Sequence, residues 1–485
     1  MLPKNFFDSY SLKFGFENLY PALPEIFIFF SSLLLLFINL TIFKKDKKNK
    51  SYRLSIIIIL SALFITIFQP NFGLDFNKLY YSSETSRYFK VLVLLSALFV
   101  LIISHNQVNN IELNSIRFYF LLLISTCGTL ILLSSYNFLT LYLALQLQMI
   151  PIYITGLLKY HKDSFSKDIL NYFVIGALSS SFMLFGISLI YGFTGTVSFD
   201  VFLNKDIIIN SGFFLGAIIF IFGLFLKMAL IPFHNWLPNI FELLPLPISF
   251  FIITAQRISI FGILILFIYK IFPYFNNNLT IIITIGSIFS MFFGSIACCF
   301  QDKINRLIAF MSISNTGFIL IGIVCNSKIG LSSTLYCILI NLFLMLGIFT
   351  TIMILKKDNR SIEYISDLKG LYNDQPFISL CFLILTLSFI GFPPFSGFFG
   401  KWFLFYASVE SNLYFLTFIG VISSLISSYY CLNILRFIFF ENSDIPLNVE
   451  QNFGIKFLMY FSSLISLLFF MILPFLEDFI NNLNI

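Results

Sequence analysis

Long apolar runs recur from one end of the chain to the other, and this pattern limits the possible folds more than any other feature. Each run has roughly 17–25 residues, the length that one helix needs to cross the hydrocarbon core of a bilayer. Hydrophobic residues make up 58% of the 485 residues and charged residues 11%, whereas soluble domains carry about 25% charged residues. The pattern therefore predicts an all-α integral membrane protein.

Polar breaks between the apolar runs give about fourteen transmembrane helices. Their expected bounds are 25–43, 54–70, 90–104, 117–135, 137–158, 169–192, 211–231, 246–272, 279–299, 305–325, 329–355, 377–403, 413–437 and 456–476. The connections between them are too short to hold a soluble domain. We therefore expect a single membrane domain over residues 1–485.

The basic residues test this helix count. If the helices alternate in direction, 18 of the 29 Lys and Arg residues lie in loops on one side, and eight, including Lys90, lie on the other side with both termini. Loops rich in Lys and Arg stay on the inner side of a membrane. The asymmetry predicts that both termini lie on the outer side. The three remaining basic residues, Lys227, Arg257 and Lys401, fall inside apolar runs.

The stretch 223–260 is the main candidate site because it carries Lys227, His234, Glu242 and Arg257 within or beside apolar sequence. An ionisable side chain at membrane depth costs about 2.5–3.5 kcal/mol on insertion scales and usually marks an ion or proton pathway. We therefore expect proton transfer through this part of the chain.

Two proline breaks accompany two of the embedded lysines. Pro232 cannot donate a hydrogen bond to the carbonyl of Met228, so the helix should open one residue after Lys227, with the freed carbonyl beside the ammonium. The two prolines at 393–394 likewise leave the carbonyls of residues 389–390 without their helical hydrogen bonds, ahead of Lys401. Membranes tolerate such breaks where protein or a water-filled cavity satisfies the backbone.

Each embedded residue allows a structural and a functional interpretation. Lys227 or Lys401 could anchor its helix by extending to the interface, but a lysine held away from water gains and releases protons more readily. Arg257 stays charged in proteins and can only tune its neighbours or pair with an acid. His234 suits proton shuttling near neutral pH, although a single histidine near a helix end is often only buried and hydrogen-bonded.

Other kinds of site have no support in the sequence. The seven cysteines show no paired spacing, and no phosphate loop, dinucleotide-binding motif or Ser–His–Asp set is present. The basic residues are spread over the short loops, which indicates topology rather than nucleic-acid binding. The N-terminus shows neither an arginine-rich presequence nor a cleavable signal.

Six segments together resemble subunit 2 of respiratory complex I, called the N subunit in bacteria. They are LTLYLALQLQMIPIY (139–153), NYFVIGALSSSFMLFGISLIYGFTGT (171–196), LKMALIPFHNWLPN (226–239), QDKINRLIAFMSISNTGFILIG (301–322), DLKGLY (367–372) and GFPPFSGFFGKWFLF (391–405). The similarity extends over nearly the whole chain from about residue 21, and the segment 171–196 distinguishes subunit 2 from the related subunits 4 and 5.

The resemblance implies fourteen helices with two inverted five-helix repeats, 117–272 and 279–437, and with breaks in the seventh and twelfth helices. It implies proton pumping driven by quinone reduction elsewhere in NADH:ubiquinone oxidoreductase. NADH, FMN, iron–sulfur clusters and ubiquinone would then bind to other subunits, and none to this chain. The expected partners are other membrane-arm subunits, including subunit 4 and small subunits, and lipids such as cardiolipin. The expected location is the mitochondrial inner membrane with both termini facing the intermembrane space, or alternatively a bacterial plasma membrane.

By position, Lys227 is similar to the seventh-helix lysine of the family and Lys401 to its twelfth-helix residue. Three positions depart from the family pattern. Gln146 stands in place of a glutamate, Arg257 in place of a lysine and Asn315 in place of a histidine. The departures leave two alternatives open: a free-standing cation/proton antiporter, and a structural membrane-arm subunit with weakened proton transfer.

Overall fold

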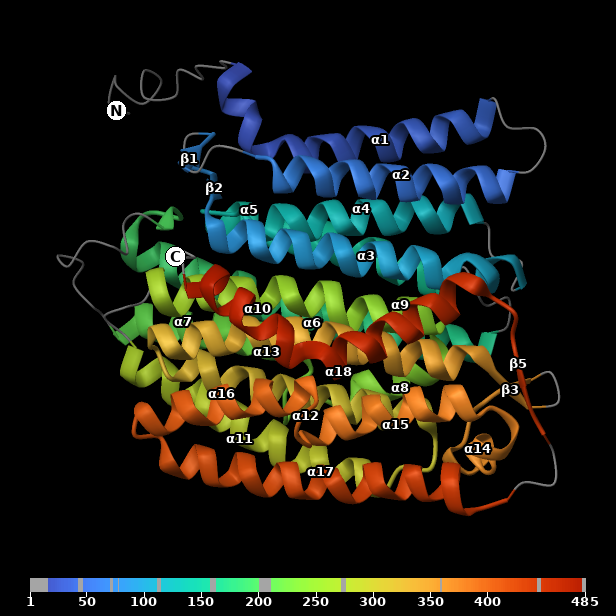
Figure 1. Cartoon of the computed structure of the whole chain (residues 1–485). Coiled ribbons are helices and arrows are strands. Elements are labelled where there is room, and N and C mark those ends of the chain that lie inside the picture. Colours follow the sequence, from blue (N-terminus) through green and yellow to red (C-terminus); the bar gives the residue numbers. More distant parts are fainter. Residues whose placement is uncertain are drawn as a thin grey trace, which may run out of the picture.

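The computed structural model describes residues 16–41, 47–69, 73–76, 78–110, 115–157, 163–199, 211–271, 276–357, 360–442 and 446–481. Helices that run side by side form almost all of this part of the chain, in one bundle (Figure 1).

The first three transmembrane helices form the upper edge of the bundle in Figure 1. A short 3-10 helix, η2 (Phe16–Ala22), leads into α1 (Leu23–Thr41), which is followed by α2 (Lys47–Ile67) and α3 (Glu84–Asn110). The antiparallel hairpin of β1 (Gly73–Asp75) and β2 (Tyr80–Ser82) joins α2 to α3, with Gly73 opposite Ser82.

The fourth to eighth helices follow, and the seventh is broken. They are α4 (Ser115–Leu133), α5 (Phe138–Leu157), α6 (Asp163–Thr194), the pair α7 (Ser211–Met228) and α8 (Trp236–Leu243), and one continuous rod of α9 (Leu246–Phe251), η4 (Ile252–Gln256), α10 (Arg257–Leu266) and η5 (Phe267–Ile271). The segments η4 and η5 are π-helical turns. Such turns insert an extra residue into a helix and are frequent at functional sites.

The ninth to fourteenth helices complete the bundle. They are α11 (Asn276–Cys299), α12 (Ile304–Val324), α13 (Lys328–Ile354), the pair α15 (Pro376–Ile390) and α16 (Ser396–Glu410), α17 (Tyr414–Phe440) and α18 (Phe453–Asn481). At the end of the bundle away from the hairpin, β3 (Leu355–Lys357) lies between β4 (Arg360–Ser361) and β5 (Leu447–Val449), near η7 (Ile365–Leu368) and α14 (Leu371–Asp374).

The described residues confirm the expected number of membrane crossings. Thirteen helices are long and apolar enough to span a bilayer, and α15 with α16 supplies a further crossing in two pieces. The start of α1 and the end of α18 lie at the same end of the bundle (Figure 1), as an even number of crossings requires.

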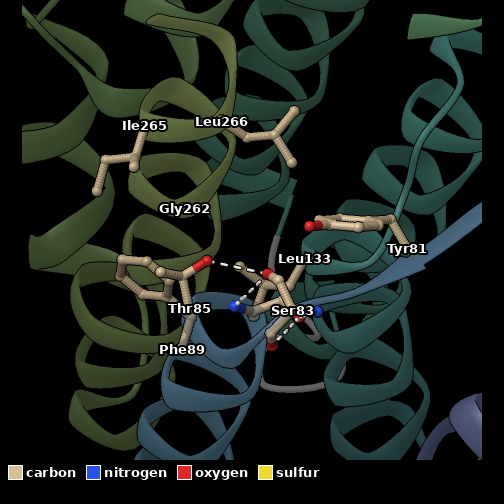
Figure 2. Close-up of a pocket in the computed structure, with 9 residues that line it drawn as sticks. Tyr81, Ser83, Thr85, Phe89, Leu133, Gly262, Ile265 and Leu266 are labelled. Carbon is tan, nitrogen blue, oxygen red and sulfur yellow. Dashed lines mark hydrogen bonds between the residues drawn. The ribbon is translucent and has the colours of Figure 1, made fainter. Parts of the chain in front are cut away.

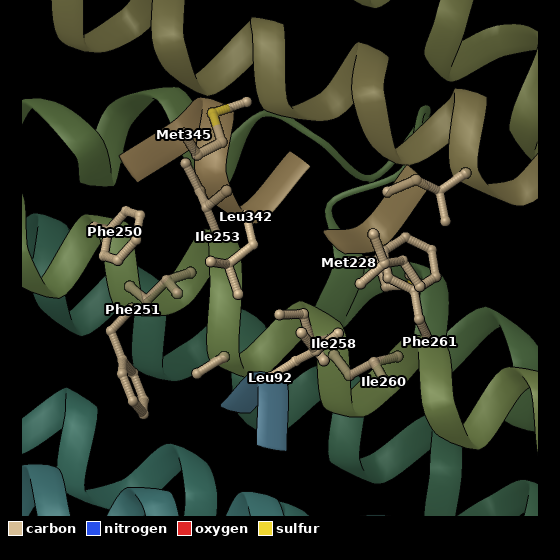
Figure 3. Packing of buried hydrophobic residues seen from close by; sticks show 14 of the residues in the cluster. Leu92, Met228, Phe250, Phe251, Ile253, Ile258, Ile260, Phe261, Leu342 and Met345 are labelled. Carbon is tan, nitrogen blue, oxygen red and sulfur yellow. The ribbon is translucent and has the colours of Figure 1, made fainter. Parts of the chain in front are cut away.

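The core lies around the eighth helix and α12, because these two segments carry apolar residues on all faces and are the most enclosed. In Figure 3, Phe250 and Ile253 of the eighth helix pack with Leu342 and Met345 of α13. Outer helices such as α6 and α18 bury only a third of their apolar windows. They direct large side chains outward, as helices that face lipid do. This arrangement places the embedded polar groups deep in the bundle.

Candidate functional site

The seventh helix opens where the sequence predicts. Its first half ends at Met228, one residue past Lys227, and Ala229 adopts a left-handed conformation with φ 57°. The Ile231–Pro232 peptide is cis, and the second half begins at Trp236. Lys227 is buried, with 7% of its surface exposed. Within the described part of the chain its ammonium has no hydrogen-bond or ion-pair partner. The expected contact with the freed carbonyl of Met228 is therefore not found.

The twelfth helix breaks in a similar way, and here the expected contact is present. Gly391 ends α15 with φ 92°, and the Pro393–Pro394 peptide is cis. Lys401 Nζ donates to the carbonyl oxygens of Phe389 at 3.0 Å and Ile390 at 2.9 Å. These are the two carbonyls that the proline pair was predicted to release. The lysine thus replaces the hydrogen bonds that the broken helix has lost.

Aromatic rings and a small cavity complete the surroundings of Lys401. Its Nζ lies 4.9 Å from the centre of the Phe318 ring, and a cation gains energy from such a ring face. A cavity of about 30 Å³ beside it is lined in part by Asn315, Asn341 and Ser388. This volume, with polar groups on its wall, is enough for a water molecule.

Arg257 directly follows the π-helical turn η4 and is 3% exposed. Its Nη1 donates to the carbonyl oxygen of Ser312 on α12 at 2.9 Å, whereas its Nη2 has no partner among the described residues. A second cavity of about 10 Å³ borders Arg257, Thr254, Thr316 and Asn341. A buried guanidinium without an acid beside it is a fixed positive charge.

Asn341 lines both cavities, and the sequence interpretation did not include it. Asn315 Nδ2 donates to Asn341 Oδ1 at 2.9 Å, so this amide pair stands between the surroundings of Arg257 and those of Lys401. The only signal in the sequence is an asparagine inside the apolar run of α13 (Lys328–Ile354). A polar group within a membrane-spanning run is itself a reason to suspect function.

Gln146 and His234 make few polar contacts with the described part of the chain. Gln146 Nε2 has no partner in the described chain. Its neighbour Gln148 instead reaches the eighth helix and donates from Nε2 to Ser259 Oγ at 3.2 Å. His234 is partly buried, with Nδ1 3.4 Å from the carbonyl oxygen of Pro232. Its ring centre lies 6.0 Å from that of Phe310.

The assignment of Lys90 to an outer loop is wrong. Lys90 lies within α3, which begins six residues earlier than the predicted span, and only 2% of the residue is exposed. Its Nζ is 2.7 Å from Glu25 Oε1 on α1. Polar residues just before Lys90 concealed the true start of the helix. A fourth basic residue is therefore embedded, and among the four it alone has an acidic partner within the described residues.

A third small cavity lies at the start of α3. It has a volume of about 20 Å³ and is bordered by Ser83 and Thr85 on one side and by Gly262 of α10 on the other (Figure 2). The two hydroxyl groups lie 2.9 Å apart. They bond to each other, and Tyr81 also lines the cavity, so its wall is partly polar.

Comparison with known proteins places the chain in a family of membrane subunits. The family model described as NADH:quinone oxidoreductase/Mrp antiporter, TM, matches residues 135–427. NADH-quinone oxidoreductase subunit N of Pelagibacter ubique (strain HTCC1062) is 32% identical over 472 residues, which cover 97% of this chain and 100% of that protein. The chain belongs to the subunit N family.

Solved structures share the fold of this subunit N chain. A chain of respiratory complex I from Thermus thermophilus with bound aureothin has a TM-score of 0.77 and 22% identity, and the match covers 93% of this chain and 98% of that one. A chain of the Mrp complex from Dietzia sp. DQ12-45-1b has a TM-score of 0.82 and 15% identity, over 95% and 96% of the two chains. The fold alone therefore does not separate the two kinds of complex, and the sequence relationship to subunit N does.

Proposed function

We propose that this chain is the proton-translocating subunit N of the membrane arm of an NADH:quinone oxidoreductase. This proposal is carried by a line of polar groups inside the bundle, which passes from the buried Arg257 through the half-buried Asn341 and Asn315 to the half-buried Lys401, with a water-sized cavity beside Lys401. Lys227 is a further buried ionisable group, at the break of the seventh helix. Quinone reduction elsewhere in the complex would drive the translocation of protons.

The lysines and the arginine have different roles in this proposal. Lys401 can give up a proton because its two carbonyl partners accept hydrogen bonds from a neutral amine as well as from an ammonium. Lys227 has no acid beside it in the described chain, so the protonated form gains little stabilisation. Arg257 remains charged and disfavours a further positive charge nearby. His234 and Gln146 stay candidates for hydrogen bonding along the path.

Asn315 and Asn341 cannot release or accept a proton at physiological pH, since carboxamides do not titrate there. A proton would pass them only along hydrogen-bonded water. The cavity that both residues border beside Lys401 has room for such water. The path therefore needs water at this point, where a histidine would supply a titratable group.

The test is proton translocation by the assembled complex after Lys227→Met and Lys401→Met. Each change should lower the number of protons moved per NADH oxidised. Lys328→Met is the matched control, because Lys328 is an exposed lysine at the start of α13. An unchanged proton yield in both site variants would overturn the proposal.

Two other functions remain as alternatives. A free-standing cation/proton antiporter is supported by the fold shared with the Mrp complex; it should purify without NADH oxidation activity. A structural subunit with weakened proton transfer is supported by Gln146, Arg257 and Asn315, which remove titratable groups. The relationship to subunit N favours the main proposal.

We also propose that residues 117–272 and 279–437 are two repeats of five helices. Both halves contain a broken helix whose first part ends directly before a residue in the left-handed conformation, Ala229 or Gly391. In both, a serine of the first helix donates to a main-chain carbonyl of the second: Ser125 to Gln148 at 2.7 Å and Ser287 to Gly317 at 2.8 Å. Five helices are an odd number, so consecutive repeats have opposite orientations.

The partners, cofactors and membrane of the protein are proposed from its relationship to subunit N. Its partners would be other membrane-arm subunits, including subunit 4 and small subunits, together with lipids such as cardiolipin. NADH, FMN, iron–sulfur clusters and ubiquinone would bind elsewhere in the complex. The membrane would be the inner mitochondrial membrane or a bacterial plasma membrane, with both termini outside. With Lys90 buried, the terminal side retains seven basic loop residues against 18, which supports this orientation.

A further inference from the structure

The short helix α8, which follows the break after Lys227, is attached to the helices on its near side through Trp236. The indole Nε1 of Trp236 donates across the break to the carbonyl oxygen of Leu226 at 3.1 Å. The indole ring also stacks on Tyr172 of α6, with ring centres 5.2 Å apart. These contacts fix the start of α8 to α7 and α6.

The other end of α8 is attached to the start of α12 by charged groups. Glu242 Oε1 lies 3.1 Å from Arg306 Nε and 3.4 Å from Lys303 Nζ. Arg306 Nη2 donates to Asn239 Oδ1 at 2.9 Å. The Nε–H of Arg306 is not aligned on the carboxylate, so the ion pair is a charge contact while the bond to Asn239 supplies direction. We call Arg306, Glu242 and Asn239 the α8–α12 clamp.

Arg306 occupies an unfavourable place for a cation unless it has this partner. It is the third residue of α12, and no acidic residue lies in the first turn of that helix. The N-terminal end of a helix carries partial positive charge, so an arginine there is disfavoured. Glu242 offsets this charge from a different helix, which makes the position of α8 matter for α12.

α12 then contacts three parts of the proposed proton path in sequence. The carbonyl of Ser312 accepts the hydrogen bond of Arg257, Asn315 bonds to Asn341, and the ring of Phe318 lies under Lys401. At about 1.5 Å of rise per residue, these contacts follow Arg306 by roughly 9, 14 and 18 Å along one helix. A shift of α12 along its axis would alter all three.

We propose that Arg306 is a positioning residue, whose clamp to Glu242 and Asn239 couples movement of α8, beside the Lys227 break, to the contacts that α12 makes with Arg257, Asn341 and Lys401. This inference rests on the proposed proton translocation and adds the element that links the two broken helices. In this proposal Arg306 does not itself carry a proton.

The test compares variants in membrane vesicles that contain the assembled complex, with proton yield measured per NADH oxidised. Arg306→Gln and Glu242→Gln should each lower the yield, and the double variant should lower it little further than the stronger single change, because each change breaks the Arg306–Glu242 contact. Arg306→Lys should retain part of the yield, since a charge remains without the bond to Asn239. Arg436→Gln is the matched control: Arg436 lies on α17 and pairs with Glu441 at 2.7 Å on an exposed surface.

The exchanged pair Arg306→Glu with Glu242→Arg distinguishes a loss of coupling from a loss of assembly. This pair should regain yield relative to Arg306→Gln if the clamp acts through pairing. Two results would overturn the inference: an unchanged yield in Arg306→Gln and Glu242→Gln while Lys227→Met lowers it, or independent, additive losses in the double variant. If Lys227→Met and Lys401→Met both leave the yield unchanged, the proposed function itself fails, which is a different outcome.

Discussion

Lys90 and Glu25 form an ion pair in which both side chains are almost completely buried, with Nζ 2.7 Å from Oε1 and side-chain exposures of 2% and 4%. The hydroxyl of Tyr80 lies beside both groups: it accepts from Lys90 Nζ at 2.7 Å and is 3.0 Å from Glu25 Oε1. The pair joins α1 to α3, and Tyr80 adds the hairpin that connects α2 to α3. The first three helices are thereby fixed to one another by buried charge.

Removing one member of this pair should destabilise the protein strongly. Lys90→Met leaves the Glu25 carboxylate buried without its counter-charge, and breaking a buried ion pair in this way costs about 3–5 kcal/mol. We expect a lower midpoint of thermal unfolding and less subunit in the assembled complex. Both can be measured on the purified complex and by immunoblot.

The double variant Lys90→Met with Glu25→Leu is the control for that prediction. Replacing both charges by apolar groups removes the desolvation cost together with the attraction, so most of the stability should return. If the double variant is as unstable as the single one, the ion pair is not the cause and packing around Lys90 is.

The two helix breaks should respond differently to exchange of alanine and glycine. Gly391 has φ 92°, and its missing Cβ leaves room for the Lys401 side chain. Gly391→Ala should therefore cost about 1–2 kcal/mol of stability. Ala229 has φ 57° with a Cβ present, so Ala229→Gly should leave stability unchanged or raise it. Thermal unfolding of the two variants provides the measurement, and equal losses in both would contradict the difference in backbone strain.

Asn341→Leu should lower proton yield with little loss of assembly. The change removes the acceptor of the Asn315 side chain and makes the wall between the two cavities apolar, so water there loses hydrogen-bond partners. We expect the yield per NADH to fall while NADH oxidation by the purified complex persists. Asn341→Gln keeps the amide and is the matched control. A full yield in Asn341→Leu would show that protons avoid this point.

The sequence predicted the membrane crossings and both breaks because apolar length and proline act locally. Met228 and Ile390 end their helices for reasons visible within a few residues, namely Pro232 and the pair 393–394. The carbonyl partners of Lys401 were predictable for the same reason.

What could not be predicted depends on contacts between distant segments. Lys90 looked like a loop residue because its partner Glu25 lies 65 positions earlier in the sequence. Asn341 gains its importance only from two cavities that separate helices enclose. Lys227 shows the converse case: the proline opened the helix as expected, yet the position of the ammonium depends on packing that the local sequence does not specify.

The loop that carries Asp367 should become less stable in acid. Burial acts to raise the pKa of Asp367, but hydrogen bonds from the Tyr364 amide and the Lys357 ammonium, with the charge of Lys357, lower it below its ordinary value. A carboxyl group whose pKa is lowered in the folded state stabilises the fold at pH values above its unfolded pKa, which is about 3.9 for aspartate. This contribution disappears as the pH falls through the folded pKa. Because the pair is partly exposed, its contribution is about 1 kcal/mol or less. The unfolding midpoint of Asp367→Asn should therefore lie slightly below that of the parent protein at pH 7, and the two should converge below about pH 4. A difference that stays constant from pH 7 to acid would show that hydrogen bonding, rather than the carboxylate charge, maintains this loop.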